Sequence, residues 1–519
     1  MSNLQKEKLI QLIYSMTTSE KRSFRLYLNS LSGSADKLFV QLFDYLDREQ
    51  IYDGAEILKN IPKIKKTQLS NLKANLFNHI LNSLRLIKRK QVDEIKVREQ
   101  IDFARILYDK GMYKQCLEIL EKAKKLSQKI NYETLTLSIL YFQKRIETQH
   151  VTGSMAPTAR ELSLQSKELL ENLELTNKLS NASLLLYGEY LKYGYVRNEK
   201  DFHQIKDFFE QHLPQVELSK LNFYQSLYYF QSYVWYSNMT HNFIQCYRYA
   251  QRWVELFRKN PNSKFSETPQ YLKGLHNLLN SLFMVQFPDR FNEVFNELES
   301  FKLFDKPFVT KNDISLWILI RNIHKLNQVF LTGEFKEGTK GLLELEELLE
   351  DNRYNWDRNR HLVFNYKIAC VYFGAGEYEK AIDFLGKITF SYIKGFREDI
   401  QCFARILSLV SHFELGNIDL VNYQVRSVMR FLLKSQNMEK VQEEILKFLR
   451  KTPRMQEKGM KKEFALLKEK LLVIKQQKFE QRPFLYFDII SWLESKIDNL
   501  PIETVIQKNL LLQLKDNKS

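Results

Sequence analysis

Apolar residues recur at every third or fourth position through most of the chain. An α-helix turns once every 3.6 residues, so residues with this spacing share one helix face, whereas a half-buried strand alternates at every second position. Sustained alternation of the second kind is hard to find. One helical series consists of Leu69, Leu72, Leu76, Ile80, Leu84 and Ile87. Thr17 and Glu20 also have the spacing of a capping box at a helix start. The pattern predicts an all-α fold.

Composition supports this fold class. The 519 residues include only 16 Gly and 10 Pro, whereas proteins built on strands need a breaker at every short connection. Hydrophobic residues make up 44% of the chain, which excludes long-range disorder.

Two windows of the chain align with each other. The first contains Phe103, Ala104, Leu107, Gly111, Met112, Tyr113, Cys116, Leu120 and Ala123. The second contains Ile368, Ala369, Tyr372, Gly376, Glu377, Tyr378, Ala381, Leu385 and Ile388. Each predicts a helix, a glycine turn, an aromatic residue and a second helix. Glycine can adopt positive φ and end the first helix, and the small Cys or Ala allows the two helices to approach closely.

On these residues the chain resembles the tetratricopeptide repeat family. The resemblance implies stacked helical hairpins that form a right-handed superhelical solenoid. Weaker copies are predicted to turn at Lys200, His241, Pro288, Gly333 and Gly416, with a further turn near Gly153. From residue 200 onward these turns and Gly376 are 40 to 47 residues apart, whereas the family period is about 34. Asn365 and Gln100 also stand where the family commonly has an aromatic residue in the first helix.

The chain is predicted to have three parts. Residues 1–92 form a basic helical N-terminal domain, and residues 93–437 form the tetratricopeptide-like repeat region. Residues 438–519 form a basic C-terminal helical cap, with a Lys-rich helix over 455–478 and an aromatic helix over 484–492. A cap is expected because the last repeat of a solenoid otherwise exposes its stacking face.

The net charge of +16 is concentrated at the two ends, because residues 1–100 and 430–519 each carry +7. The cations near the end of the N-terminal domain are Lys63, Lys65, Lys66, Lys88, Arg89 and Lys90. One interpretation is a nucleic-acid contact that neutralises phosphates. The other is a solvated helix end, where cations are favourable. The sequence favours the second, since no helix-turn-helix glycine pattern or aromatic stacking platform accompanies these cations.

Two segments are candidate partner-binding surfaces. The loop around residues 351–361 supplies Arg353, Tyr354, Trp356, Arg358 and Arg360, residue types that are enriched at interfaces. A polar loop between hairpins is the alternative. Tyr224, Tyr228, Tyr233 and Tyr236 have helical spacing and are candidates to line the concave groove of a solenoid. Ordinary core packing, with the hydroxyls reaching water, is the alternative for them.

Known catalytic motifs are not found. The sequence has no Gly-rich phosphate loop, no nucleophile elbow and no zinc-binding HExxH, so no catalytic, cofactor-binding or metal-binding residue is predicted. The four cysteines are widely separated, which suits reduced core thiols. No signal peptide or membrane-spanning helix is predicted, so a cytoplasmic location and no membrane insertion are expected.

The sequence therefore predicts a non-enzymatic helical-repeat scaffold or adaptor that binds a protein or peptide along the concave face of its solenoid. The alternative is a regulatory protein whose basic N-terminal domain contacts nucleic acid while the repeats sense a peptide or protein partner. An enzyme with an unrecognised site is the third hypothesis.

Overall fold

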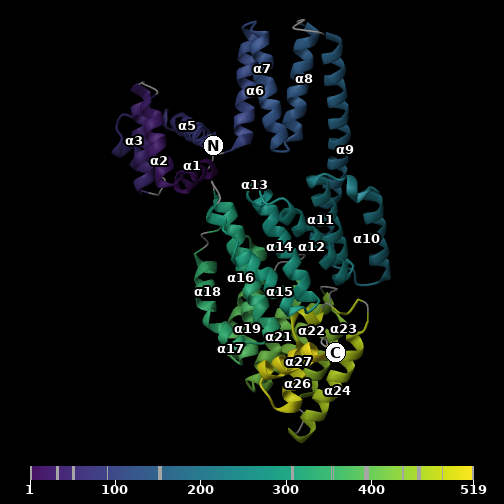
Figure 1. The fold of residues 1–519 in the computed structure, drawn as a ribbon. Helices are drawn as coiled ribbons and strands as arrows, with labels where there is room; N and C mark the ends of the chain where they lie inside the picture. Colours follow the sequence, from purple (N-terminus) through teal and green to yellow (C-terminus); the bar gives the residue numbers. More distant parts are fainter. Residues whose placement is uncertain are drawn as a thin grey trace. The chain divides into compact units, whose positions relative to one another are not determined.

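The computed structural model describes residues 3–30, 34–49, 53–89, 92–149, 155–305, 309–351, 354, 356–390, 397–434, 438–452, 457–477, 479–481 and 483–516. Within these ranges the chain forms 27 α-helices and two short 3-10 helices, with no β-strand (Figure 1). The all-α prediction is confirmed. Over the same ranges, no helix has an apolar stretch long enough to cross a lipid bilayer.

The chain divides into two compact units, Met1–Glu174 and Leu175–Ser519. The division falls inside α9 (Met155–Tyr193), which contributes residues to both units.

The first unit contains two helical clusters, each with its own hydrophobic core. The helices of the first cluster are α1 (Asn3–Ser15), α2 (Thr18–Ser30), α3 (Ser34–Glu49), α4 (Gly54–Asn60) and α5 (Leu69–Lys88). Those of the second are α6 (Asp93–Asp109), α7 (Tyr113–Lys129) and α8 (Glu133–Gln149). The predicted capping box is confirmed at the start of α2. Thr17 N donates to Glu20 Oε2 at 2.7 Å, and Glu20 N donates to Thr17 Oγ1 at 3.2 Å.

The second unit contains the remaining helices. Its first half consists of α10 (Glu199–His212), α11 (Phe223–Met239), α12 (Phe243–Lys259), α13 (Ser263–Ser266), α14 (Thr268–Met284), α15 (Pro288–Glu299), α16 (Lys311–Thr332), α17 (Phe335–Lys340) and α18 (Leu342–Glu350). Its second half consists of α19 (Arg358–Ala375), α20 (Tyr378–Phe390), α21 (Glu398–Glu414), α22 (Ile418–Lys434), α23 (Lys440–Lys451), α24 (Glu457–Lys475), α25 (Pro483–Tyr486), α26 (Ile489–Asp498) and α27 (Ile502–Asp516). The 3-10 helices are η1 (Leu218–Lys220) and η2 (Leu303–Asp305).

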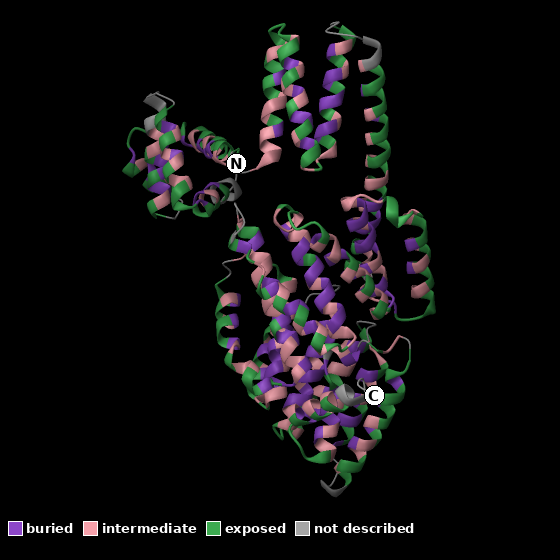
Figure 2. Ribbon diagram, in the orientation of Figure 1, coloured by how far each residue is buried: buried purple, intermediate pink, exposed green. Residues whose placement is uncertain are grey.

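Burial differs sharply between these helices. Ile205 and Phe209 are buried on α10, whereas α21 is buried along most of its length. Figure 2 shows the exposed face of α10 in green.

The predicted glycine turns are present. Gly111 and Gly376 have φ values of 74° and 83°, and after each turn a backbone N–H reaches back to the preceding helix. Met112 N donates to Leu107 O, and Glu377 N donates to Tyr372 O, both at 2.9 Å. This is the bonding pattern of a Schellman C-cap.

The weaker turns follow the same rule. Gly333 and Gly416 have φ values of 71° and 74°, and His241 and Gln286 reach about 60° without being glycine. The turn predicted at Lys200 lies earlier, at residues 194–198, because the Asn198 side chain accepts from Asp201 N and caps α10. The turn predicted near Gly153 lies outside the described residues.

Small residues allow the paired helices to approach closely. Cys116 Sγ on α7 lies 3.1 Å from Ala104 O on α6, and Cys246 Sγ on α12 lies 3.8 Å from Val234 O on α11. Ala381 on α20 occupies the corresponding position and is fully buried. A larger side chain at this position would push the two backbones apart.

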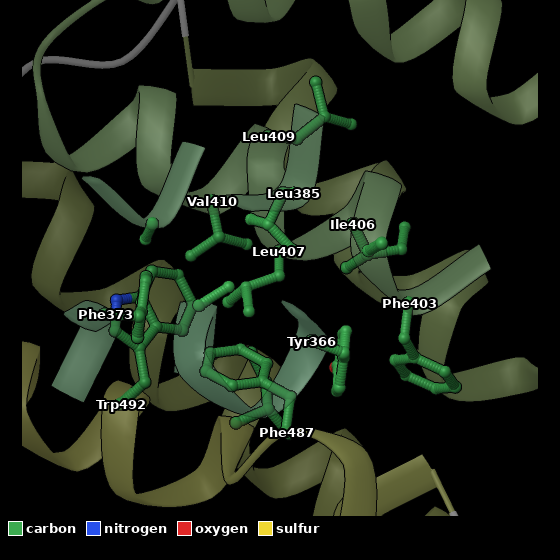
Figure 3. Close-up of a cluster of buried hydrophobic side chains, with 14 of the residues drawn as sticks. Tyr366, Phe373, Leu385, Phe403, Ile406, Leu407, Leu409, Val410, Phe487 and Trp492 are labelled. Atoms are coloured by element: carbon green, nitrogen blue, oxygen red, sulfur yellow. The ribbon is translucent and has the colours of Figure 1, made fainter. Parts of the chain in front are cut away.

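The C-terminal segment completes the core of the second unit. Phe487 lies 5.1 Å from Phe373 between ring centroids, and Trp492 Nε1 donates to the buried Glu414 carboxylate at 2.6 Å. Figure 3 shows Phe487 and Trp492 among the side chains of this core. Further along, α27 contacts α16 and α19. The aromatic helix predicted over 484–492 is interrupted, since Asp488 accepts from Ser491 N and caps a new helix, α26.

Candidate ligand-binding cavity

The second unit contains a cavity of about 1040 Å³. Its wall is formed largely by α9, α11, α14, α16 and α19 and by residues 475–510 at the C-terminal end. Four of these helices are each the first member of a helical pair: α11 is followed by α12, α14 by α15, α16 by α17, and α19 by α20. Of those second members, α12 contributes Phe243 and Trp253, and α17 contributes Phe335. First helices of successive pairs therefore form a large part of the wall, and α9 and the C-terminal segment form the rest.

Aromatic rings form one part of the wall. Tyr187 and Tyr190 on α9 lie 4.9 and 5.8 Å from Trp235 on α11 between ring centroids. Tyr195 lies 5.8 Å from Tyr190, and the two hydroxyls are 3.3 Å apart. Tyr187 is 40% exposed, so this aromatic cluster is accessible and offers flat apolar faces with hydrogen-bonding hydroxyls.

Carboxamides join three of the wall helices. Ser183 Oγ on α9 donates to Gln231 Oε1 on α11 at 3.1 Å, and Gln231 Nε2 donates to Gln270 Oε1 on α14 at 3.0 Å. Asn277 also belongs to the wall. Each carboxamide carries both donor and acceptor groups, as a peptide backbone does.

A chain of hydrogen bonds runs across α14, α16 and α19. The Asn280 amide lies 3.0 Å from His276 Nε2, and His276 Nδ1 lies 2.9 Å from His324 Nε2. His324 Nδ1 lies 3.1 Å from Asn327 Nδ2, and Lys367 Nζ donates to Asn327 Oδ1 at 2.6 Å. Burial lowers the pKa of His276 to about 4 and the pKa of His324 well below its ordinary value. Both imidazoles are therefore neutral at pH 7, and each has one donor and one acceptor nitrogen.

The charge on Lys367 fixes the direction of this chain. A charged ammonium donates to Asn327, whose NH₂ group then donates to His324 Nδ1. His324 Nε2–H donates to His276 Nδ1, which leaves His276 Nε2–H as a donor toward Asn280. The structure has Asn280 Nδ2 at this position, so this direction requires the Asn280 amide turned by 180° to present its oxygen. Each imidazole nitrogen then has one complementary partner, and the two orientations of an amide have nearly the same shape.

Lys367 lies at the end of the chain in an apolar part of the wall. Its ammonium is 5.5 Å from the ring centroid of Phe283 and 5.2 Å from that of Phe330, which are cation–π distances. Burial lowers the pKa of Lys367 to about 8. The lysine is mainly charged at pH 7, and no carboxylate of the described residues lies within 4 Å of it.

Positive groups outnumber carboxylates in the wall. Lys273, Arg360, Arg397 and Lys475 line the cavity together with Lys367. The carboxylate among the lining residues is Asp488, which caps α26. Arg397 pairs with Asp399 at 2.8 Å, and Arg360 lies 3.4 Å from Asp357. Arg360 and Arg397 thus each have a carboxylate partner, whereas Lys367 has none among the described residues.

Two further polar atoms of the wall residues are buried without a partner. Trp253 Nε1 and Asn238 Oδ1 bond to no polar atom of the described residues. A buried donor or acceptor left unpaired costs about 1–3 kcal/mol, so the wall residues include one unpaired donor and one unpaired acceptor.

The structure separates the four predicted tyrosines. Tyr228 lines the cavity. Tyr224 donates to Glu267 Oε1 at 2.8 Å, Tyr233 stacks on Tyr249 at 4.0 Å, and Tyr236 stacks on Phe209 at 4.1 Å. The last three belong to the packing between helices and are not among the lining residues.

The predicted loop residues are also divided. Arg360 lines the cavity, and Arg358 is exposed elsewhere. Trp356 is buried, donates to Ser315 Oγ at 3.1 Å and carries Tyr354 stacked on its ring at 5.6 Å, so both aromatic residues belong to the core. Arg353 lies outside the described residues.

The candidate nucleic-acid residues do not form one patch. Lys63, Lys65 and Lys66 are exposed before the start of α5, whereas Lys88 and Arg89 lie at its other end. A helix of 20 residues is about 30 Å long. Arg89 also pairs with Glu99 at 2.9 Å, and Lys90 lies outside the described residues.

Sequence reasoning missed the polar chain. The available signal was a set of polar residues inside otherwise apolar helices, such as Lys367 between Tyr366 and Ile368. Periodicity identifies a buried helix face, but it does not tell a polar residue that lines a cavity from one that faces solvent.

Comparison of the chain with protein-family models, curated proteins and solved structures finds no match in any of the three.

Proposed function

We propose that this chain is a non-enzymatic, tetratricopeptide-like helical-repeat protein that binds a peptide, or an extended segment of a partner protein, in the cavity of its second unit. In this proposal the helical pairs form a right-handed superhelical solenoid, and the cavity is its concave face. The protein acts as an adaptor or scaffold in the cytoplasm, where its four cysteines stay reduced.

One observation carries the proposal: a large part of the cavity wall is built from α11, α14, α16 and α19, the first helices of four successive helical pairs. A repeat architecture presents the same face of each unit along a continuous surface, which suits an extended ligand.

Size and chemistry support a peptide in particular. Small-molecule sites have volumes of roughly 300–1,000 Å³, and this cavity, at about 1040 Å³, is at or above that range. Its carboxamides match the donors and acceptors of a peptide backbone. Its aromatic cluster around Trp235 offers an apolar surface for side chains.

The test is affinity selection from a synthetic library of random octapeptides with the full chain, followed by measurement of each Kd by fluorescence anisotropy. Wild type is expected to retain a defined set of peptides. Trp235→Ala removes the centre of the aromatic cluster and is expected to raise the Kd of these peptides at least about 10-fold, as truncation of an interface hot spot does. Trp235→Phe is expected to have an intermediate effect, because it keeps the aromatic packing.

The matched control is Tyr423→Ala on α22, since Tyr423 is 80% exposed and is not a lining residue. Tm values of all variants check folding. If wild type retains no peptide, or if Tyr423→Ala weakens binding as much as Trp235→Ala, the proposal is wrong.

A further inference from the structure

The charged end of the polar chain points to the chemistry of the ligand. An ammonium has three N–H bonds, and Lys367 uses one of them on Asn327 Oδ1. The other two have no acceptor among the described residues, although the group lies beside two phenylalanine rings that are themselves 6.4 Å apart between centroids. Lys367 is half-buried in the cavity wall, and a charge that is partly removed from water is unfavourable unless it is paired. The ammonium can therefore take an anionic partner that the described residues do not supply.

The surroundings of Lys367 strengthen this point. The nearby titratable groups are His276 on α14, His324 on α16, and Arg360, Tyr366 and Cys370 on α19. None of them is an anion at pH 7. Arg397, Lys475, Lys273 and Asp488 complete the charged groups of the wall, and the Asp488 carboxylate is engaged as a helix cap. The field in the cavity therefore favours a negative ligand.

We propose that the peptide ligand is acidic and presents a carboxylate to the Lys367 ammonium, which Asn327 and the imidazoles behind it position to receive it. This inference rests on the peptide-binding function proposed above. In the complex the ammonium gains a charged partner in a site of low polarity, where such pairs are strong.

Two substitutions test the pairing in different ways. Lys367→Met keeps most of the volume of the side chain and removes its charge. Asn327→Asp keeps the lysine but supplies a carboxylate from the protein, 2.6 Å from Nζ in the position of the present acceptor. The introduced carboxylate would also accept from His324 Nδ1–H. His324 Nε2 would then accept from His276 Nδ1–H, and His276 Nε2 would accept from the Asn280 NH₂ group. The substituted chain is thus fully satisfied, so Asn327→Asp is expected to fold and to raise Tm at pH 7.

The experiment uses the full chain and random octapeptides, prepared both as free acids and as C-terminal amides, at pH 7. Wild type is expected to enrich peptides that contain Asp, Glu or a free C-terminus. Lys367→Met and Asn327→Asp are both expected to raise the Kd of the enriched peptides at least about 30-fold, the usual effect of breaking a buried charge pair. Lys220→Met is the control, since it removes an exposed charge on η1. Enrichment of free acids alone assigns the anion to the peptide terminus, and equal enrichment of amides assigns it to a side chain.

Two results would overturn the inference while leaving peptide binding intact. Wild type would retain neutral peptides as tightly as acidic ones, or Lys367→Met would bind the acidic peptides as tightly as wild type. Retention of no peptide of any composition would instead contradict the proposed function, and this inference with it.

Discussion

At the scale of single residues, Lys367 is the most informative side chain of the second unit. Its ammonium is desolvated by the wall of the cavity and held by one amide oxygen and two aromatic rings. Desolvation penalises the charged form, which is why the pKa falls to about 8. The folded chain therefore binds fewer protons at this lysine than the unfolded chain does between pH 8 and about 10.4.

This difference in proton binding predicts a pH-dependent effect of Lys367→Met on stability. A group whose pKa is lowered by folding adds stability as the pH rises from its folded toward its unfolded pKa. Lys367→Met is therefore expected to be more stable than wild type at pH 7, by about 1–2 °C in Tm, and the gap is expected to close by about pH 10.5. Thermal unfolding across this range measures it, and a gap that is constant with pH would contradict the account.

Glu439 is a second residue whose pKa is shifted by folding, and its pKa is raised where that of Lys367 is lowered. Burial and the neighbouring charge of Glu480 raise the pKa of Glu439 to about 8. Glu439 Oε2 and Glu480 Oε2 are both buried without a partner among the described residues. The folded state therefore favours a protonated Glu439, and this contribution to stability is lost as the pH rises from about 4 to 8.

Glu439→Gln keeps an oxygen to cap α23 and removes the titrating proton. We expect the variant to exceed wild type by about 2 °C in Tm at pH 8.5 and to match it at pH 4.5. Glu379→Gln is the charge-matched control, because Glu379 is exposed on α20. An equal effect of the two substitutions at pH 8.5 would contradict the burial argument.

Individual site residues were predictable only where their type is characteristic of binding. Tyr228 and Arg360 were predicted in this way; the structure places both in the cavity wall, and their role in binding stays a prediction. The same criteria also selected Trp356, which is a core residue, since interface and core share aromatic chemistry. Lys367 was missed because its role depends on helices α14 and α16, which lie about 40 to 90 residues away in the chain.

At the scale of helices, the connections between paired helices depend on left-handed residues. Gly376 has a φ of 83°, and a Cβ added there would meet no atom within 4 Å. The cost of a side chain at this position is therefore conformational rather than steric. The turn was predictable from sequence because its requirement is local: one glycine ends one helix.

Two alanine substitutions are expected to have opposite effects. Gly376→Ala places a side chain at positive φ and is expected to destabilise the second unit by about 1 kcal/mol. Gly188→Ala, within α9, also meets no atom within 4 Å and is expected to stabilise by about 0.5–1 kcal/mol, because alanine favours the helix. Chemical denaturation measures both, and destabilisation by both substitutions would show that the turn geometry is not the cause.

At the scale of the whole molecule, the all-α class was predictable and the closure of the second unit was not. Helical periodicity can be recognised in each segment by itself, whereas the packing of α27 against α16 and α19 depends on contacts between residues far apart in the sequence. The segment 484–492 was predicted to cap the last repeat as one aromatic helix, and the packing of Phe487 on Phe373 and of Trp492 on Glu414 follows only from the structure.

The two compact units predict separable unfolding. Each has its own hydrophobic cores, so differential scanning calorimetry of the full chain is expected to show at least two transitions. Gly376→Ala is expected to lower the transition of the second unit and leave the other in place. A single transition that shifts as a whole would contradict independent units.

The central claim, that the first helices of the second unit form a peptide-binding cavity, is tested most directly by locating a bound peptide. A selected octapeptide with a photoreactive phenylalanine is cross-linked to the full chain, and the modified residues are identified by mass spectrometry. The account predicts cross-links within 180–195, 228–243, 270–286, 316–335 and 359–374, which hold the lining residues of α9, α11, α14, α16 and α19. Cross-links confined to α15, α20, α22 or the first unit would contradict it.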